Sequence, residues 1–321
     1  MVLRLTPGIR GRPLRQNMEI TVNDRFDRRQ FLKLAGLGGA VFASALNGWA
    51  QPVKAASRRD QDFYFVQLSD THWGFNDPAI NPDASGTLRK AVAAVNALEH
   101  KPDFVVFTGD LTHTTDDPVE RRKRLSEFRE IASHLEVKTV RFMPGEHDAS
   151  LDRGKAFREF FGAPNYTFDH KGIHFIVLDN VSDPAAAIGD EQLKWLAADL
   201  VRVNKEDPVV VLTHRPLFDL YPQWDWATRD GAKALELFKD HEYVTVFYGH
   251  IHQEHHFTTG HIEHHSAKSL MFPLPAPGSM PKRRPLAWDA AAPYRGLGFR
   301  EVDAEPKTHK LALTELPVSE G

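Results

Sequence analysis

The chain has 321 residues, a length that suits one large or two small domains. It contains no cysteine, which excludes disulfides and thiolate ligands, so any metal must bind histidine and carboxylate side chains. The net charge of −3 argues against a nucleic-acid-binding surface. The charge is unevenly distributed, because residues 1–56 carry nine of the 40 Lys and Arg but only three of the 43 Asp and Glu.

The basic N-terminal segment is predicted to be an export signal. Arg28 and Arg29 stand together before Phe31-Leu32-Lys33, and a weakly apolar run extends from residue 34 to residue 50. This order of residues resembles a twin-arginine export signal. The apolar run is too short and too rich in Gly and Ala to span a membrane comfortably. The alternative is an ordinary amphipathic helix at the N-terminus.

We expect residues 1–56 to be the signal region, either cleaved or disordered, and residues 57–321 to form one domain. Cleavage is expected after Ala45, Ala50 or Ala55, and Met18 is an alternative start. The expected location is the periplasm or the cell exterior, and the expected partner during export is the twin-arginine translocase. No transmembrane anchor is expected after cleavage.

Five apolar runs in the remaining chain share one design, in which a buried strand ends at a polar side chain. These ends are Asp70 with His72, Gly109-Asp110, Gly145-Glu146-His147-Asp148, His214, and His250 with His252. Helical periodicity over residues 84–99 and 118–135 separates the first three strands, so the first half is predicted to be β-α-β-α-β. Because the carboxyl ends of parallel strands meet at one edge of a sheet, the pattern predicts one metal site at that edge.

The second half contains further elements and one irregular segment. The pattern predicts paired strands at residues 166–169 and 173–179, followed by a helix at residues 190–203. It then predicts a hairpin formed by residues 253–259 and 261–268, and two final strands at residues 296–303 and 308–315. The C-terminal part is therefore expected to be a second, more antiparallel sheet. Residues 272–293 are rich in proline and carry Lys282-Arg283-Arg284, which suits a rim for an anionic substrate.

Two features of this half keep alternatives open. The aromatic loop over residues 215–226 is either a plug over the core or a lid over the site. Its start beside His214 favours the lid, in which Trp224 and Trp226 would contact the substrate. The hairpin contains five histidines, which form either an extra metal site or a solvated or supporting surface. Alternation divides them between two faces and favours the second interpretation. His174 is expected to be structural.

The ordered polar groups resemble the calcineurin-like metallophosphoesterase family over about residues 62–315. The resemblance implies an α/β fold (α+β in some schemes) with four layers, in which two mixed β-sheets pack as a sandwich flanked by helices. It also implies two bound metal ions, drawn from Fe, Mn and Zn. A hydroxide that bridges them would attack phosphorus.

The resemblance assigns the side chains as follows. Asp70, His72 and His252 would hold one ion, His214 and His250 the other, and Asp110 would bridge them. His147 would stabilise the transition state or protonate the leaving oxygen, and Asp148 would orient His147.

Two positions depart from the family pattern. The motif normally reads Gly-Asn-His-Asp or Gly-Asn-His-Glu, but here the residue is Glu146, which keeps a metal ligand and lowers the charge of the site by one unit. His113 stands where purple acid phosphatases have a tyrosine ligand, and it is either an added ligand or a solvent-facing loop residue.

The sequence thus predicts an exported, binuclear metal-dependent phosphoesterase. A phosphodiester is favoured as substrate because of the charge of Glu146, and the substrate is expected to be a small molecule or a lipid. The alternatives are a general phosphomonoesterase and a non-catalytic metal- or ligand-binding envelope protein on the same fold.

The export signal leads to a first prediction. Replacing both Arg28 and Arg29 with Lys should retain the protein in the cytoplasm, because a receptor recognises the arginine pair and not its charge alone. Immunoblotting of periplasmic and cytoplasmic fractions measures the outcome, and Arg25→Lys is the matched control. Unchanged periplasmic recovery of the double variant would exclude a twin-arginine signal.

Overall fold

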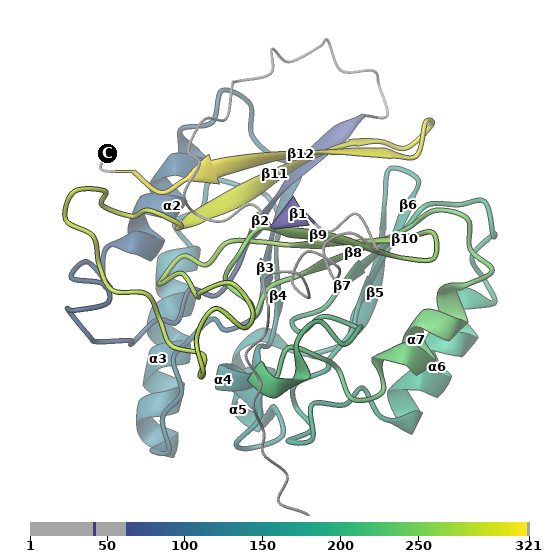
Figure 1. Cartoon of the computed structure of the whole chain (residues 1–321). Helices are drawn as coiled ribbons and strands as arrows, with labels where there is room; N and C mark the ends of the chain where they lie inside the picture. The colour runs from purple at the N-terminus through teal and green to yellow at the C-terminus, as the bar shows by residue number, and fades with distance from the viewer. Residues whose placement is uncertain (1–40, 43–61, 320–321) are drawn as a thin grey trace, which may run out of the picture.

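The computed structural model describes residues 41–42 and 62–319 (Figure 1). The arginine pair of the predicted signal lies outside these residues. Within the described ranges, no helix is long and apolar enough to cross a membrane.

The first sheet contains the early parallel strands and the C-terminal hairpin. In spatial order it consists of β12 (Lys310–Pro317), β11 (Gly298–Glu305), β2 (Phe63–Leu68), β3 (Phe104–Thr108) and β4 (Val140–Met143). The strands β2, β3 and β4 are parallel, as the sequence predicted, and β11 pairs antiparallel with β2.

The second sheet contains seven strands. In spatial order it consists of β1 (Val41–Phe42), β9 (His255–Thr259), β10 (Ile262–Ser266), β8 (Val244–Tyr248), β7 (Val209–Leu212), β6 (Ile173–Val177) and β5 (Tyr166–His170). The prediction of a separate antiparallel sheet at the C-terminus was wrong, because β9 and β10 extend this sheet whereas β11 and β12 extend the first. The short strand β1, from the predicted signal region, pairs with β9 at the edge.

Helices cover the outer face of each sheet (Figure 1). The first sheet is covered by α2 (Thr87–Asn96), α3 (Pro118–Ala132) and α5 (Lys155–Phe161), and the second by α6 (Asp190–Leu200) and α7 (Gly231–Phe238). The start of α3 is fixed locally, because Asp117 accepts a hydrogen bond from the Val119 N–H and Pro118 occupies the first helical position. Two short elements, α4 (Glu146–Ala149) and the 3₁₀ helix η1 (Pro222–Trp224), lie in loops.

Aromatic side chains fill the space between the two sheets. Phe65 of β2 stacks on Phe104 with ring centroids 4.8 Å apart, and it meets Phe175 and Phe247 of the other sheet edge-on, each at 5.8 Å. All four rings are buried. The alternation of these side chains along each strand produces a sandwich of two mixed sheets with helices outside, which confirms the predicted α/β fold class.

Candidate metal centre

The seven expected metal ligands gather at the carboxyl ends of strands from both sheets. Asp70 and His72 follow β2, Asp110 follows β3 and Glu146 follows β4, whereas His214 follows β7, and His250 and His252 follow β8. The sequence predicted that the metal centre lies at one edge of a single sheet. The structure instead places the centre where the two sheets converge, so each sheet supplies only part of it.

The backbone at these residues is unusual. Five of them have φ between +40° and +66°, namely Asp70, His72, Asp110, His250 and His252. Residues with a Cβ rarely occupy this left-handed region, and such strain persists where the surroundings enforce it. Neighbouring glycines leave the necessary space, since a Cβ on Gly145 would lie 2.0 Å from an Asp110 carboxylate oxygen and one on Gly249 would lie 2.1 Å from Ser69 Oγ.

Asp70, His72, Asp110 and His252 form the first group able to hold a cation. His72 Nε2 lies 3.1 Å from His252 Nε2 and 3.5 Å from Asp110 Oδ2. His252 Nε2 lies 3.3 Å from Asp70 Oδ1. These distances leave each ligand atom facing the same small volume, which suits one ion bound by imidazole and carboxylate.

Glu146, His214 and His250 form the second group. Glu146 Oε2 lies 2.8 Å from His214 Nε2, and Glu146 Oε1 lies 2.9 Å from His250 Nδ1. Asp110 Oδ2, which faces His72, is also 3.4 Å from His214 Nε2. Asp110 therefore stands between the two groups, in the position expected for a bridging ligand.

The outer nitrogens of three imidazoles show how the centre is prepared for cations. His214 Nδ1 donates to the Thr108 carbonyl at 2.7 Å, His252 Nδ1 to the Phe272 carbonyl at 2.7 Å, and His250 Nε2 to the Asp225 carbonyl at 2.9 Å. Because a carbonyl can only accept, each neutral ring carries its proton outward and presents a lone pair inward.

Those inward lone pairs face carboxylate oxygens, an arrangement that is repulsive unless a cation lies between them. Consistent with this, His214 Nε2 is buried and makes no hydrogen bond of good geometry. Burial lowers the pKa of His214, but the carboxylates of Asp110 and Glu146 raise it well above its usual value. Without a metal ion, the inward nitrogen of His214 would therefore hold a proton, and a metal ion would take the place of that proton. The donor set fits two metal ions.

A different contact orients the His147 ring toward the same volume. Its Nδ1 accepts a hydrogen bond from the Thr114 backbone N–H at 3.0 Å, so the neutral ring carries its proton on Nε2. Nε2 lies 3.9 Å from Asp110 Oδ2, at the edge of the centre. The ring can thus donate a proton or a hydrogen bond into the site.

The expectation that Asp148 orients His147 was wrong. The Asp148 carboxylate is buried and accepts hydrogen bonds from the backbone N–H groups of Leu111, Thr112 and Gly145 at 2.8 to 2.9 Å. Burial and the nearby Asp110 carboxylate raise the pKa of Asp148 to about 6. Asp148 instead ties the loop after β3 to the turn after β4, which fixes Asp110 relative to Glu146.

His113 is partly buried, and its ring lies against other histidines of the centre. Its Nδ1 lies 3.3 Å from His72 Nδ1, and its ring stacks on His147 with centroids 5.0 Å apart. His72, His113 and His147 together form a further group with ligand atoms close to one another. This position favours the added-ligand interpretation.

Arg215 is a residue that sequence reasoning missed. It is buried beside the centre, with Nε 3.9 Å from Glu146 Oε2 and a terminal guanidinium nitrogen 2.7 Å from Asp225 Oδ2. The signal was present in the sequence, because Arg215 directly follows His214. A cation one residue from a predicted ligand is a natural partner for the unexpected carboxylate of Glu146.

The aromatic loop is a plug and not a lid. Trp224 is 5% exposed and Trp226 is 0% exposed, and both pack in a cluster with Tyr248, Ile251 and Met271. Neither indole can therefore contact a substrate, as the lid interpretation required. The loop still serves the centre through the Asp225 carbonyl, which orients His250.

The histidines of the β9–β10 hairpin divide between two faces, as alternation predicted. His255 and His264 are buried, whereas His256 and His265 pair on the other side with Nδ1 atoms 2.8 Å apart. His255 Nδ1 lies 2.7 Å from the Tyr248 hydroxyl. Among the described residues, no group able to hold a metal arises from this hairpin. His174 lies between Asp169 and Asp199, as expected for a structural residue.

A sequence profile named calcineurin-like phosphoesterase matches residues 63–254, more than half of the chain. The chain belongs to the calcineurin-like phosphoesterase family. This assignment confirms the predicted enzyme class, the metal-dependent phosphoester hydrolases.

Relatives of this phosphoesterase carry different names. A probable cyclic nucleotide phosphodiesterase of Rhodococcus erythropolis is 27% identical over 216 residues, covering 62% of this chain and 68% of that protein. A serine/threonine-protein phosphatase of Mus musculus is 27% identical over 177 residues, covering 49% of this chain and 57% of that protein. A dimetal phosphatase structure from Danio rerio superposes with a TM-score of 0.54 at 14% identity, covering 80% of this chain and 97% of that one, which shows the shared fold.

The buried plug of this phosphoesterase leads to a second prediction. Trp226→Ala should lower the free energy of unfolding by about 3–5 kcal/mol, because it opens a cavity in the buried aromatic cluster. Chemical denaturation measures the change, and Trp195→Ala, at a half-buried site on α6, is a control expected to cost less. A variant of unchanged stability with a raised KM would restore the lid interpretation.

Proposed function

We propose that the chain is a binuclear metal-dependent phosphodiesterase. The observation that carries the proposal is the inward orientation of three imidazole lone pairs around the shared carboxylate of Asp110. Asp70, His72 and His252 would hold one ion, and Glu146, His214 and His250 the other. The ions when bound supply Lewis acidity and lower the pKa of water.

The chain's own groups supply the remaining functions. Asp110 places negative charge between the two ion sites, and its other oxygen accepts the His147 backbone N–H at 2.9 Å, which fixes the carboxylate plane. His147 presents its Nε2 proton to the leaving oxygen, and Thr114 holds the ring in that tautomer. Thr114 is therefore a positioning residue.

The preference for a diester rests on charge. A monoester near neutral pH carries close to two negative charges, whereas a diester carries one. Arg215 lies near Glu146, but Asp225 already forms a shorter ion pair with that guanidinium. Glu146 therefore adds net negative charge to the second ion site and disfavours the dianion. The relatives' names include both phosphodiesterase and phosphatase, so they do not decide this point.

Export completes the proposal. The arginine pair and the Gly/Ala-rich run that follows it support translocation of the folded protein to the periplasm or cell exterior by the twin-arginine translocase. The expected substrate is then a small-molecule or lipid phosphodiester found outside the cytoplasm.

A third prediction tests Asp110 as the ligand that the two ion sites share. Asp110→Asn should reduce bound metal from two ions per chain and abolish hydrolysis of a chromogenic diester, because a neutral amide cannot offset two adjacent cations. Elemental analysis measures occupancy independently of activity. Asp103→Asn, in the residue before β3, is a matched control away from the centre. Two ions and undiminished turnover in Asp110→Asn would refute the assignment.

A fourth prediction tests the charge argument. Glu146→Gln should raise kcat/KM for a phosphomonoester relative to a diester by about tenfold, which corresponds to about 1.4 kcal/mol at the second ion site. Glu146→Asn should act in the same direction, because both changes remove the charge and supply an amide donor. Arg215→Met should shift the ratio the opposite way, because it removes a guanidinium that offsets part of the Glu146 charge.

The ratio must be compared at matched metal occupancy, measured by elemental analysis. If the ratio is unchanged in both Glu146 variants, this residue does not set the selectivity, and the diester preference loses its physical basis.

A further inference from the structure

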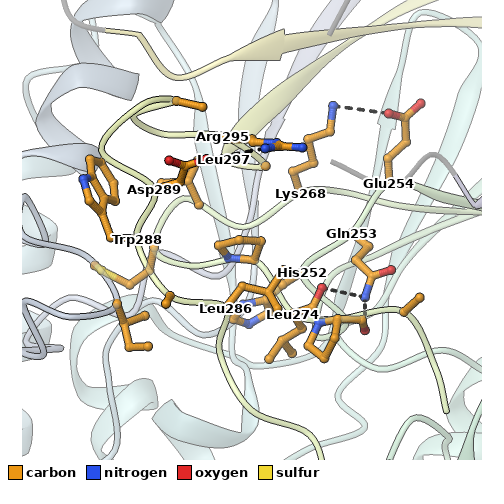
Figure 2. Close-up of a pocket in the computed structure, with 18 residues that line it drawn as sticks. His252, Gln253, Glu254, Lys268, Leu274, Leu286, Trp288, Asp289, Arg295 and Leu297 are labelled. Carbon is orange, nitrogen blue, oxygen red and sulfur yellow. Dashed lines mark hydrogen bonds and ion pairs between the residues drawn. The ribbon is translucent and has the colours of Figure 1, made fainter. Parts of the chain in front are cut away.

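A cavity of about 450 Å³ lies beside the metal centre (Figure 2). Much of its wall comes from the proline-rich segment that precedes β11, and Ile80, Gln253, Glu254 and Lys268 contribute elsewhere. His252 also lines it, and Figure 2 shows this ring near Leu274 and Leu286. The volume is in the range of small-molecule sites in proteins.

The chemistry of the wall selects an uncharged, apolar group. Leu274, Leu286, Leu297 and Trp288 present hydrocarbon and aromatic surface. The charged side chains in the wall are already paired, because Lys268 Nζ lies 3.2 Å from a Glu254 carboxylate oxygen and an Arg295 guanidinium nitrogen lies 3.5 Å from an Asp289 oxygen. An ionic group would have to compete with these pairs, whereas an apolar group would only displace water.

The same segment also reaches the metal centre. The carbonyl of Phe272 accepts from His252 Nδ1, and the Phe272 ring lies 4.7 Å from the His252 ring and 5.0 Å from the His72 ring, centroid to centroid. Farther along, an Arg283 guanidinium nitrogen lies 3.5 Å from His250 Nε2. One stretch of chain thus forms the cavity wall and also contacts ligand rings of both ion groups, with Arg283 on the outward side of His250.

We infer that this cavity binds the organic group that remains on phosphorus after the diester is cleaved, and that this group is apolar and aromatic or acyl in character. His147, which would protonate the leaving oxygen, is absent from the cavity lining, so the departing alcohol lies elsewhere. Within the cavity, Trp288 would contact the organic group. This inference rests on the proposed function and names its substrate class.

The test uses two non-hydrolysable phosphonates that mimic the monoester product. Methylphosphonate offers the phosphoryl group alone, whereas benzylphosphonate adds an aromatic ring. Calorimetric titration of the manganese-loaded full chain should show benzylphosphonate binding about tenfold more tightly, as burial of a ring predicts. Trp288→Ala and Leu286→Asp should each remove most of that difference in affinity. The first change removes aromatic surface from the cavity wall, and the second places a carboxylate in it.

Trp195→Ala is the matched control, because it also truncates a half-buried tryptophan but lies on α6, against the other sheet. It should keep the tenfold difference. Equal affinities for the two phosphonates in the unmodified protein, or a difference that survives both cavity variants, would overturn the inference while leaving the phosphoesterase proposal intact. Failure of the loaded protein to bind either phosphonate would instead contradict the proposed function.

Discussion

Three imidazole lone pairs and several carboxylates converge on one buried volume, and the rest of the structure depends on keeping them there. Such a cluster is unfavourable without cations, because buried like charges and lone pairs repel in a medium of low dielectric constant. The chain holds it with backbone carbonyls behind each ring and with left-handed residues at five ligand positions. The geometry is thus imposed by the fold in advance of any ion, which is the basis of selective and tight binding.

The centre also joins the two sheets. The Asp70 carboxylate after β2 accepts the backbone N–H of His250 after β8 at 3.1 Å, and Gln67 of β2 donates to the Tyr248 carbonyl of β8 at 3.2 Å. Away from the centre, the buried Arg300 of β11 donates to the Ser266 carbonyl of β10 at 2.6 Å. Polar contacts therefore fix the relative position of the two sheets, while the aromatic core between them supplies non-directional attraction. A sandwich held by side-chain packing alone could slide, and the ligand atoms would then separate.

Sequence reasoning located the individual strands and the ligands at their ends, because buried apolar runs followed by Gly, Asp or His are local patterns. It failed where the outcome depends on partners far along the chain. The sheet to which β11 and β12 belong is decided by pairing with β2, more than 200 residues earlier along the chain, and no local pattern encodes that choice. Likewise, an aromatic loop looks the same as a lid or as a plug until the cluster around Trp226 is known. The helix α7 was missed because it spans only eight residues, too few for a clear periodic pattern, although Asp230 precedes it at the N-cap.

The spacing of the ligands along the chain has a consequence for folding. His72 faces His252, and Asp70 binds the His250 N–H, each across 180 positions of sequence. Contacts of such long range form late, because the entropy of closing so large a loop must be offset by structure already in place. A truncated or partly folded chain would hold only fragments of each ligand set and would bind ions weakly. Full metal occupancy therefore reports that the whole domain has folded, and release of the ions would be an early sign that the two sheets have begun to part.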